Sequence, residues 1–190
     1  MGLKEGKAHV HGMRGTIDGL GGNGMKISGQ MAPHELGSHG TVVDEDTFEL
    51  VTELEIRKAV RLQYYVSLLT ITPDADTGEI PDAEALARQL APIISQQLRG
   101  TDLIGVSADS PQLHVLLINA HLDSLSVVIQ RLSEEVSRHV FQINGKRQAL
   151  NLAMGGACFP TTAGTRQDLF NQATAHVSPT RQNGSSQALS

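Results

Sequence analysis

The chain has 190 residues and a formal net charge of −5, with 39% hydrophobic residues, 3% aromatic residues and no tryptophan. An acidic chain without a run of Lys or Arg excludes a protein that binds the nucleic-acid backbone, because such binding needs a basic surface. No apolar stretch approaches the roughly 20 residues that cross a bilayer, and a single cysteine, Cys158, excludes an internal disulfide. We therefore expect a cytoplasmic protein with an aliphatic core, one domain and no membrane segment.

Residues 1–41 are rich in glycine, and residues 19–24 fit the G-x-G-x-x-G pattern of a phosphate-binding loop. No clear strand precedes this pattern and no amphipathic helix follows it. The pattern therefore lacks the strand and helix that flank a genuine phosphate-binding loop. The histidines of this segment have no Cys or carboxylate partner at the spacing of metal ligands. We expect residues 1–41 to be a flexible leader or the remnant of an upstream module, and we expect no metal site and no cofactor.

Residues 44–63 and 82–98 carry apolar residues at a spacing of about 3.6, which predicts two amphipathic helices, and Asp44 or Asp46 can cap the first of them. Residues 64–72 (YYVSLLTIT) lie between the helices and are almost all apolar or β-branched, as in a central strand that is covered on both faces. Pro73 is expected to end this strand.

Residues 99–118 (RGTDLIGVSADSPQLHVLLI) predict the end of the second helix followed by a β-hairpin. The two β-rich runs, 103–106 and 113–118, flank a turn made of polar and turn-forming residues. If the chain has a functional site, we expect it in this segment.

Residues 123–139 predict a third helix, and residues 140–143 and 148–159 predict two further strands around an Asn-Gly turn. A last helix is expected to end at Val177, and the polar residues 179–190 are expected to be disordered. From residue 64 onward the order is β-α-β-β-α-β, which predicts a ferredoxin-like α+β fold. We expect an antiparallel sheet with its helices on one face.

Several segments of residues 45–178, in their order, resemble the GGDEF domains of diguanylate cyclases. FELVTELEIRKAVRLQYYVSLLTIT is similar to the family's lead helix and first strand, and ARQLAPIISQQLRGTD to its second helix, which ends in an R-x-x-D motif. LNLAMGGACFP resembles the strand usually written S-I-G-V-A-x-x-P, and DLFNQATAHV resembles the final helix. The resemblance implies a GGDEF-like domain over residues 42–178, of nucleotidyl-cyclase type, in bacterial signalling through cyclic di-GMP.

The chain departs from active members of this family where catalysis takes place. The turn that reads G-G-D/E-E-F in the family is here Ala108, Asp109, Ser110, Pro111 and Gln112. Thr70 and Thr72 stand where the family's first strand carries metal-binding carboxylates. Joining two GTP molecules requires divalent metals, which need fixed carboxylate oxygens. The resemblance therefore implies a degenerate domain that is not an enzyme.

Arg99 and Asp102 preserve the R-x-x-D motif, which in the family forms an inhibitory site for cyclic di-GMP, and Arg131 roughly matches an auxiliary arginine of that site. Arginine can clamp a phosphate or a guanine edge with two hydrogen bonds, while a carboxylate accepts from guanine N–H groups. In the structural alternative, Arg99 stabilises a helix end and Asp102 opens a loop. Because the motif lies at a helix end, we expect substitutions there to leave the fold intact.

Three functions stay open from the sequence. The first is an inactive regulatory or interaction domain that binds cyclic di-GMP through Arg99 and Asp102, with help from Arg131. The second is a structural domain without a nucleotide ligand, which docks a protein partner or forms a homodimer, for instance through the lead helix. The third is a residual nucleotide enzyme with four candidate carboxylates, Asp74, Asp76, Glu84 and Asp109.

Overall fold

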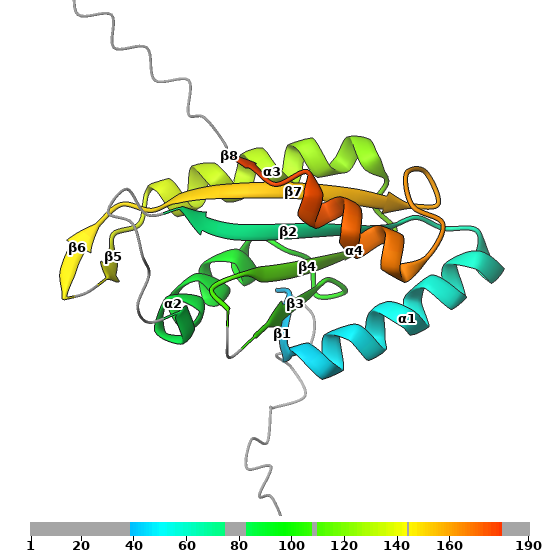
Figure 1. Cartoon of the computed structure of the whole chain (residues 1–190), viewed down its shortest axis with the longest axis horizontal. Coiled ribbons are helices and arrows are strands. Elements are labelled where there is room, and N and C mark those ends of the chain that lie inside the picture. The colour runs from blue at the N-terminus through cyan, green and yellow to red at the C-terminus, as the bar shows by residue number, and fades with distance from the viewer. Residues whose placement is uncertain (1–38, 75–82, 108–109, 144, 180–190) are drawn as a thin grey trace, which may run out of the picture. The chain divides into compact units, whose positions relative to one another are not determined.

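Four helices and eight strands occur in the residues that the computed structural model describes, which are 39–74, 83–107, 110–143 and 145–179 (Figure 1). In chain order the elements are β1 (Thr41–Asp44), α1 (Glu45–Leu62), β2 (Val66–Asp74), α2 (Ala83–Gln96), β3 (Leu103–Val106), β4 (Leu113–Ile118), α3 (Leu122–Ser137), β5 (Phe141–Ile143), β6 (Lys146–Gln148), β7 (Asn151–Phe159), α4 (Arg166–Ala175) and β8 (Ser178–Pro179). Among these residues, no helix is both long and apolar enough to cross a membrane.

A six-stranded sheet runs through the domain in the order β1-β3-β4-β2-β7-β8. β1 and β3 pair in parallel, and all the other neighbours pair antiparallel. β5 and β6 form a separate two-stranded ribbon. The predicted α+β fold is confirmed, and the apolar strand β2 is central as expected because β4 and β7 flank it on its two sides.

The helices cover both faces of the sheet, so the expectation that they lie on one face is wrong. Leu69 and Ile71 of β2 pack into a cluster with α2 and α3. Val66 and Leu68 of the same strand pack into a second cluster with α1 and α4, which lie on the same side of the sheet (Figure 1). Successive side chains of a strand point to opposite faces, so a strand that is apolar at nearly every position needs cover on both.

Two predicted strand boundaries are also corrected. β2 continues through Pro73 to Asp74, where it has only β7 beside it, because its pairing with β4 stops at Ile71. The missing N–H of Pro73 therefore removes no hydrogen bond to β4. The predicted strand 148–159 is divided, because β6 turns back on β5 and ends at Gln148 while β7 begins at Asn151.

The described domain begins earlier than residue 42. The Gly40 N–H donates to the Ser95 carbonyl oxygen at 3.1 Å, and the Ser95 hydroxyl donates to the Gly40 carbonyl oxygen at 2.6 Å. The Thr41 N–H donates to the carbonyl oxygen of Asp102 at 3.0 Å. Gly40 and Thr41 thus belong to the domain rather than to the predicted leader, and Pro179 of the predicted tail lies in β8. The expectations for residues 1–38 and 180–190 fall outside the described residues.

Candidate functional site

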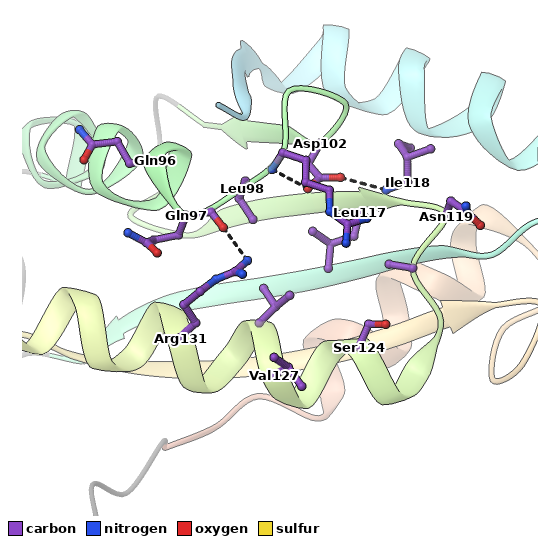
Figure 2. A pocket seen from close by; sticks show the side chains of 13 residues that line it. Gln96, Gln97, Leu98, Asp102, Leu117, Ile118, Asn119, Ser124, Val127 and Arg131 are labelled. Atoms are coloured by element: carbon purple, nitrogen blue, oxygen red, sulfur yellow. Dashed lines mark hydrogen bonds between the residues drawn. The ribbon is translucent and has the colours of Figure 1, made fainter. Parts of the chain in front are cut away.

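A pocket of about 440 Å³ lies where the C-terminal end of α2 meets the end of β4 and the helix α3 (Figure 2). Arg99, Asp102 and Arg131, the three residues predicted to bind a ligand, all line it. Both arginine side chains are exposed, whereas Asp102 is only 4% exposed. The pocket therefore combines two permanent cations with one buried carboxylate, which suits an anionic ligand that can accept several hydrogen bonds.

The Asp102 carboxylate holds together the wall of the pocket. One oxygen accepts from the Arg99 N–H at 3.0 Å and the other from the Ile118 N–H at 3.2 Å, so the turn after α2 is tied to the end of β4 (Figure 2). Burial raises the pKa of Asp102, although the two N–H groups and the Arg99 charge act to lower it. These contacts give Asp102 a structural role, and from them we expect its replacement to destabilise the domain, unlike the expectation from the sequence.

The two arginines differ in how they are held. The Arg131 guanidinium donates to the carbonyl oxygen of Gln97 at 2.5 Å, across the gap between α3 and the end of α2 (Figure 2). The Arg99 guanidinium makes no hydrogen bond or salt bridge within the part of the chain that the structure describes. Arg99 is thus available to a ligand as it stands, whereas Arg131 would have to share or leave the Gln97 carbonyl oxygen.

The turn between β3 and β4 and the neighbouring part of β2 carry neutral polar contacts. The Ser110 hydroxyl accepts from the Gln112 N–H at 3.1 Å, and the Gln112 side chain donates to the Thr72 hydroxyl at 3.2 Å. Ala108 and Asp109 of the predicted turn lie outside the described residues. Thr70 is fully buried, and its hydroxyl lies 3.2 Å from Nδ1 of His114. Within the described ranges, no group of three or more His, Cys, Asp or Glu side chains is arranged to hold a metal ion.

Comparisons with known proteins identify the fold. The sequence matches no protein-family model and no curated protein. The structure matches the GGDEF domain of FimX from Pseudomonas aeruginosa with a TM-score of 0.62 and 20% sequence identity, over 71% of this chain and 86% of that chain. This is the fold of a GGDEF domain.

Two further solved GGDEF proteins match at a similar level. One comprises the coiled coil and GGDEF domain of DgcB from Caulobacter crescentus in complex with c-di-GMP, with a TM-score of 0.60 and 12% identity, over 70% of this chain and 73% of that chain. The other is the diguanylate cyclase SiaD from P. aeruginosa in complex with its activator SiaC, with a TM-score of 0.60 and 16% identity, over 70% of this chain and 52% of that chain. At these identities, the likeness establishes the GGDEF fold.

His114 is a notable residue of this GGDEF fold that sequence reasoning missed, because its place in an apolar run marks it as an ordinary strand residue. Its ring packs against two phenylalanine rings, with centroid distances of 6.0 Å to Phe48 and 5.3 Å to Phe170. The adjoining cavity, about 10 Å³, has room for no more than a water molecule. Burial lowers the pKa of His114, while the carboxylates of Glu45 and Glu49 act to raise it. The net effect lowers the pKa and so favours the neutral imidazole.

This burial predicts a stability that depends on pH. Because the pKa of His114 is lower in the folded state than the ordinary 6.5, the unfolded chain takes up the proton first as the pH falls. The stability that neutral His114 contributes is thus fully present above pH 6.5 and is lost as the pH falls below it. The free energy of unfolding changes by no more than about 1.4 kcal/mol per pH unit for this one group. Urea unfolding measured at pH 7.5 and at pH 5.5 gives the drop in the free energy of unfolding between the two. This drop should be smaller for His114→Gln than for the wild type. Equal drops would contradict the prediction.

Proposed function

We propose that this chain is a GGDEF-like regulatory domain that binds cyclic di-GMP and makes none. The observation that carries the proposal is that Arg99 and Asp102, from the turn after α2, and Arg131, from α3, line one pocket of about 440 Å³. A dinucleotide with two phosphates and two guanines offers both the negative charge and the hydrogen-bond edges that arginine recognises. The DgcB structure, which contains c-di-GMP, supports the choice of ligand for this fold.

The contacts of each residue suggest its role in binding. The Arg99 guanidinium, exposed and without a hydrogen bond to the described residues, would take a phosphate or a guanine edge in two parallel hydrogen bonds. Arg131 would add a second cation from α3 once it leaves the Gln97 carbonyl oxygen. Asp102 already accepts from two main-chain N–H groups and is nearly buried, so we assign it chiefly to positioning Arg99.

Binding of cyclic di-GMP is tested by calorimetric titration at one salt concentration. Wild type should bind, Arg99→Ala should show no measurable binding, and Arg99→Lys should bind clearly more weakly because lysine lacks the planar fork. Arg88→Ala is the matched control, because Arg88 is an exposed arginine of α2 that pairs with Glu84 and does not line the pocket. It should bind like wild type.

Two outcomes would overturn this assignment. Equal affinities of wild type and Arg99→Ala would place the ligand elsewhere on the domain. A wild type that binds no cyclic di-GMP would leave a protein-interaction domain as the better function. The complex of SiaD with its activator SiaC supports that second candidate, since it shows a protein of this fold bound to a protein partner.

The absence of cyclase activity is proposed from the polar contacts on β2. Thr70 and Thr72 offer neutral hydroxyls, engaged with His114 and Gln112, in place of carboxylates that could hold divalent metals. We expect no cyclic di-GMP from GTP with either magnesium or manganese, measured by chromatography of the nucleotides after prolonged incubation. Product above the level of a protein-free reaction would contradict this expectation.

A further inference from the structure

The outward face of α1 carries two leucines that the described domain does not cover. Leu50 is 61% exposed and Leu54 is 44% exposed, one helical turn apart on the same stripe. Phe48 and Ala59, on the opposite side of the helix, are buried against the sheet. With about 100° per residue, the leucine stripe points almost directly away from the core, and Asp46 and Arg61 extend it at its two ends.

The charges along α1 are divided between its two halves. Its first half contains the acidic residues Glu45, Asp46, Glu49 and Glu53, whereas its second half contains Arg57, Lys58 and Arg61 beside one acidic residue, Glu55. Arg57 and Lys58 are engaged in salt bridges within α1, to Glu53 and Glu55. Asp46 and Arg61 have no ion pair within the described ranges. Unpaired charges of opposite sign therefore flank the leucines, at positions about 22 Å apart along the helix axis.

We propose that α1 is the interface through which two copies of this chain form an antiparallel dimer. A two-fold axis through the level of Glu53 and Leu54 brings Leu54 of the two copies together. It places Leu50 of each copy between Leu54 and Arg57 of the other. The same axis brings Asp46 of each copy to Arg61 of the other. Such an interface is isologous, as in most homodimers. In a parallel pair, the acidic halves would face each other, and so would the basic halves.

The self-complementary charge favours a second copy over an unrelated protein as the occupant of this surface. One pair of helices buries less than the roughly 1,200 Å² of a stable protein interface, so the dimer should be weak and should dissociate on dilution. The pocket of Arg99 lies beside α3, whereas α1 packs on the opposite face of the sheet, so the dimer does not depend on the proposed ligand.

A charge-swap series tests the pairing by sedimentation velocity of the full chain over a range of concentrations. Asp46→Arg and Arg61→Glu should each weaken dimerisation about five- to tenfold, because the two-fold axis repeats each repulsion. The double variant should return to within about threefold of the wild-type affinity, since both ion pairs are restored with reversed sign. Lys146→Glu, an exposed reversal on β6, should dimerise like wild type.

Cysteine cross-linking locates the axis independently. Under mild oxidation, Leu54→Cys should form a disulfide between two copies, because residues near a two-fold axis face each other. Val127→Cys is the matched control, because this residue of α3 is 63% exposed on the other face of the sheet, and it should remain largely uncross-linked. The native Cys158 is fully buried and does not interfere.

Three outcomes would overturn the proposal. A wild type that stays monomeric at every concentration would mean that another segment or another protein covers the leucines. A dimer that responds equally to Lys146→Glu and Arg61→Glu would not involve α1. Equal cross-linking of Leu54→Cys and Val127→Cys would show that the copies meet only by random collision.

Discussion

Replacing Asp102 by alanine is expected to lower the free energy of unfolding by about 2–4 kcal/mol, because two partly buried main-chain N–H groups lose their side-chain acceptor. These donors belong to Arg99 and Ile118, so the change releases the turn after α2 from the end of β4. The same turn also holds β1, whose Thr41 N–H donates to the Asp102 carbonyl oxygen. Asp102→Asn should cost less, since it keeps one acceptor oxygen. Urea unfolding followed by circular dichroism measures all three proteins.

Asp123→Ala provides the control for Asp102. The Asp123 side chain is 92% exposed at the start of α3, and we expect its removal to change stability by about 0.5 kcal/mol or less. Similar losses for Asp102→Ala and Asp123→Ala would contradict a structural role for Asp102.

Because the pKa of Asp102 is raised, the stability difference between wild type and Asp102→Ala should depend on pH. Between the ordinary value of 3.8 and its higher folded value, the folded protein holds the Asp102 proton while the unfolded chain has released it. The contribution of Asp102 is therefore complete below pH 3.8 and falls as the pH rises through the folded pKa. The stability difference between wild type and Asp102→Ala should accordingly be larger in acid than at neutral pH. A stability difference between the two proteins that grows as the pH rises would contradict this prediction.

Replacing Phe48 by alanine is expected to lower the free energy of unfolding by about 3–5 kcal/mol, the usual range for a buried phenylalanine. Phe48 is 1% exposed and fills the space over Gly105, where an added Cβ would lie 2.6 Å from its ring. Its ring also stacks near His114 and meets Phe170 edge-on, with centroids 6.3 Å apart. The shortened side chain would leave a cavity between α1, β3 and α4 that this packing cannot close.

Leu50→Ala is the matched control for Phe48, two residues further along the same helix. Leu50 is 61% exposed, so its replacement should change the stability of the dilute monomer by about 0.5 kcal/mol or less. Thermal melts and urea unfolding at low protein concentration compare the two variants. Equal losses would mean that α1 does not pack on the sheet through Phe48.

Local sequence signals by themselves determined the elements of the fold. Asp44 caps α1 as predicted, its carboxylate accepting from the Thr47 N–H at 2.8 Å. The helical periodicity of α2 and α3 and the apolar run of β2 predicted elements close to those observed, because side-chain spacing follows directly from helix and strand geometry. The resemblance of residues 99–102 to the R-x-x-D motif of the GGDEF family likewise pointed to Arg99 and Asp102.

Only the tertiary structure decided how these elements meet. From the sequence, Gly40 and Thr41 were predicted to belong to a glycine-rich leader. Their hydrogen bonds to Ser95 and Asp102 place them in the domain instead. The lowered pKa of His114 depends on its packing in β4 against Phe48 of α1 and Phe170 of α4, which lie far from it in sequence. Arg131 reaches the pocket of Arg99 because α2 and α3 cover the same face of the sheet. Burial and long-range contacts are properties of the packed chain, and a local pattern of residues does not encode them.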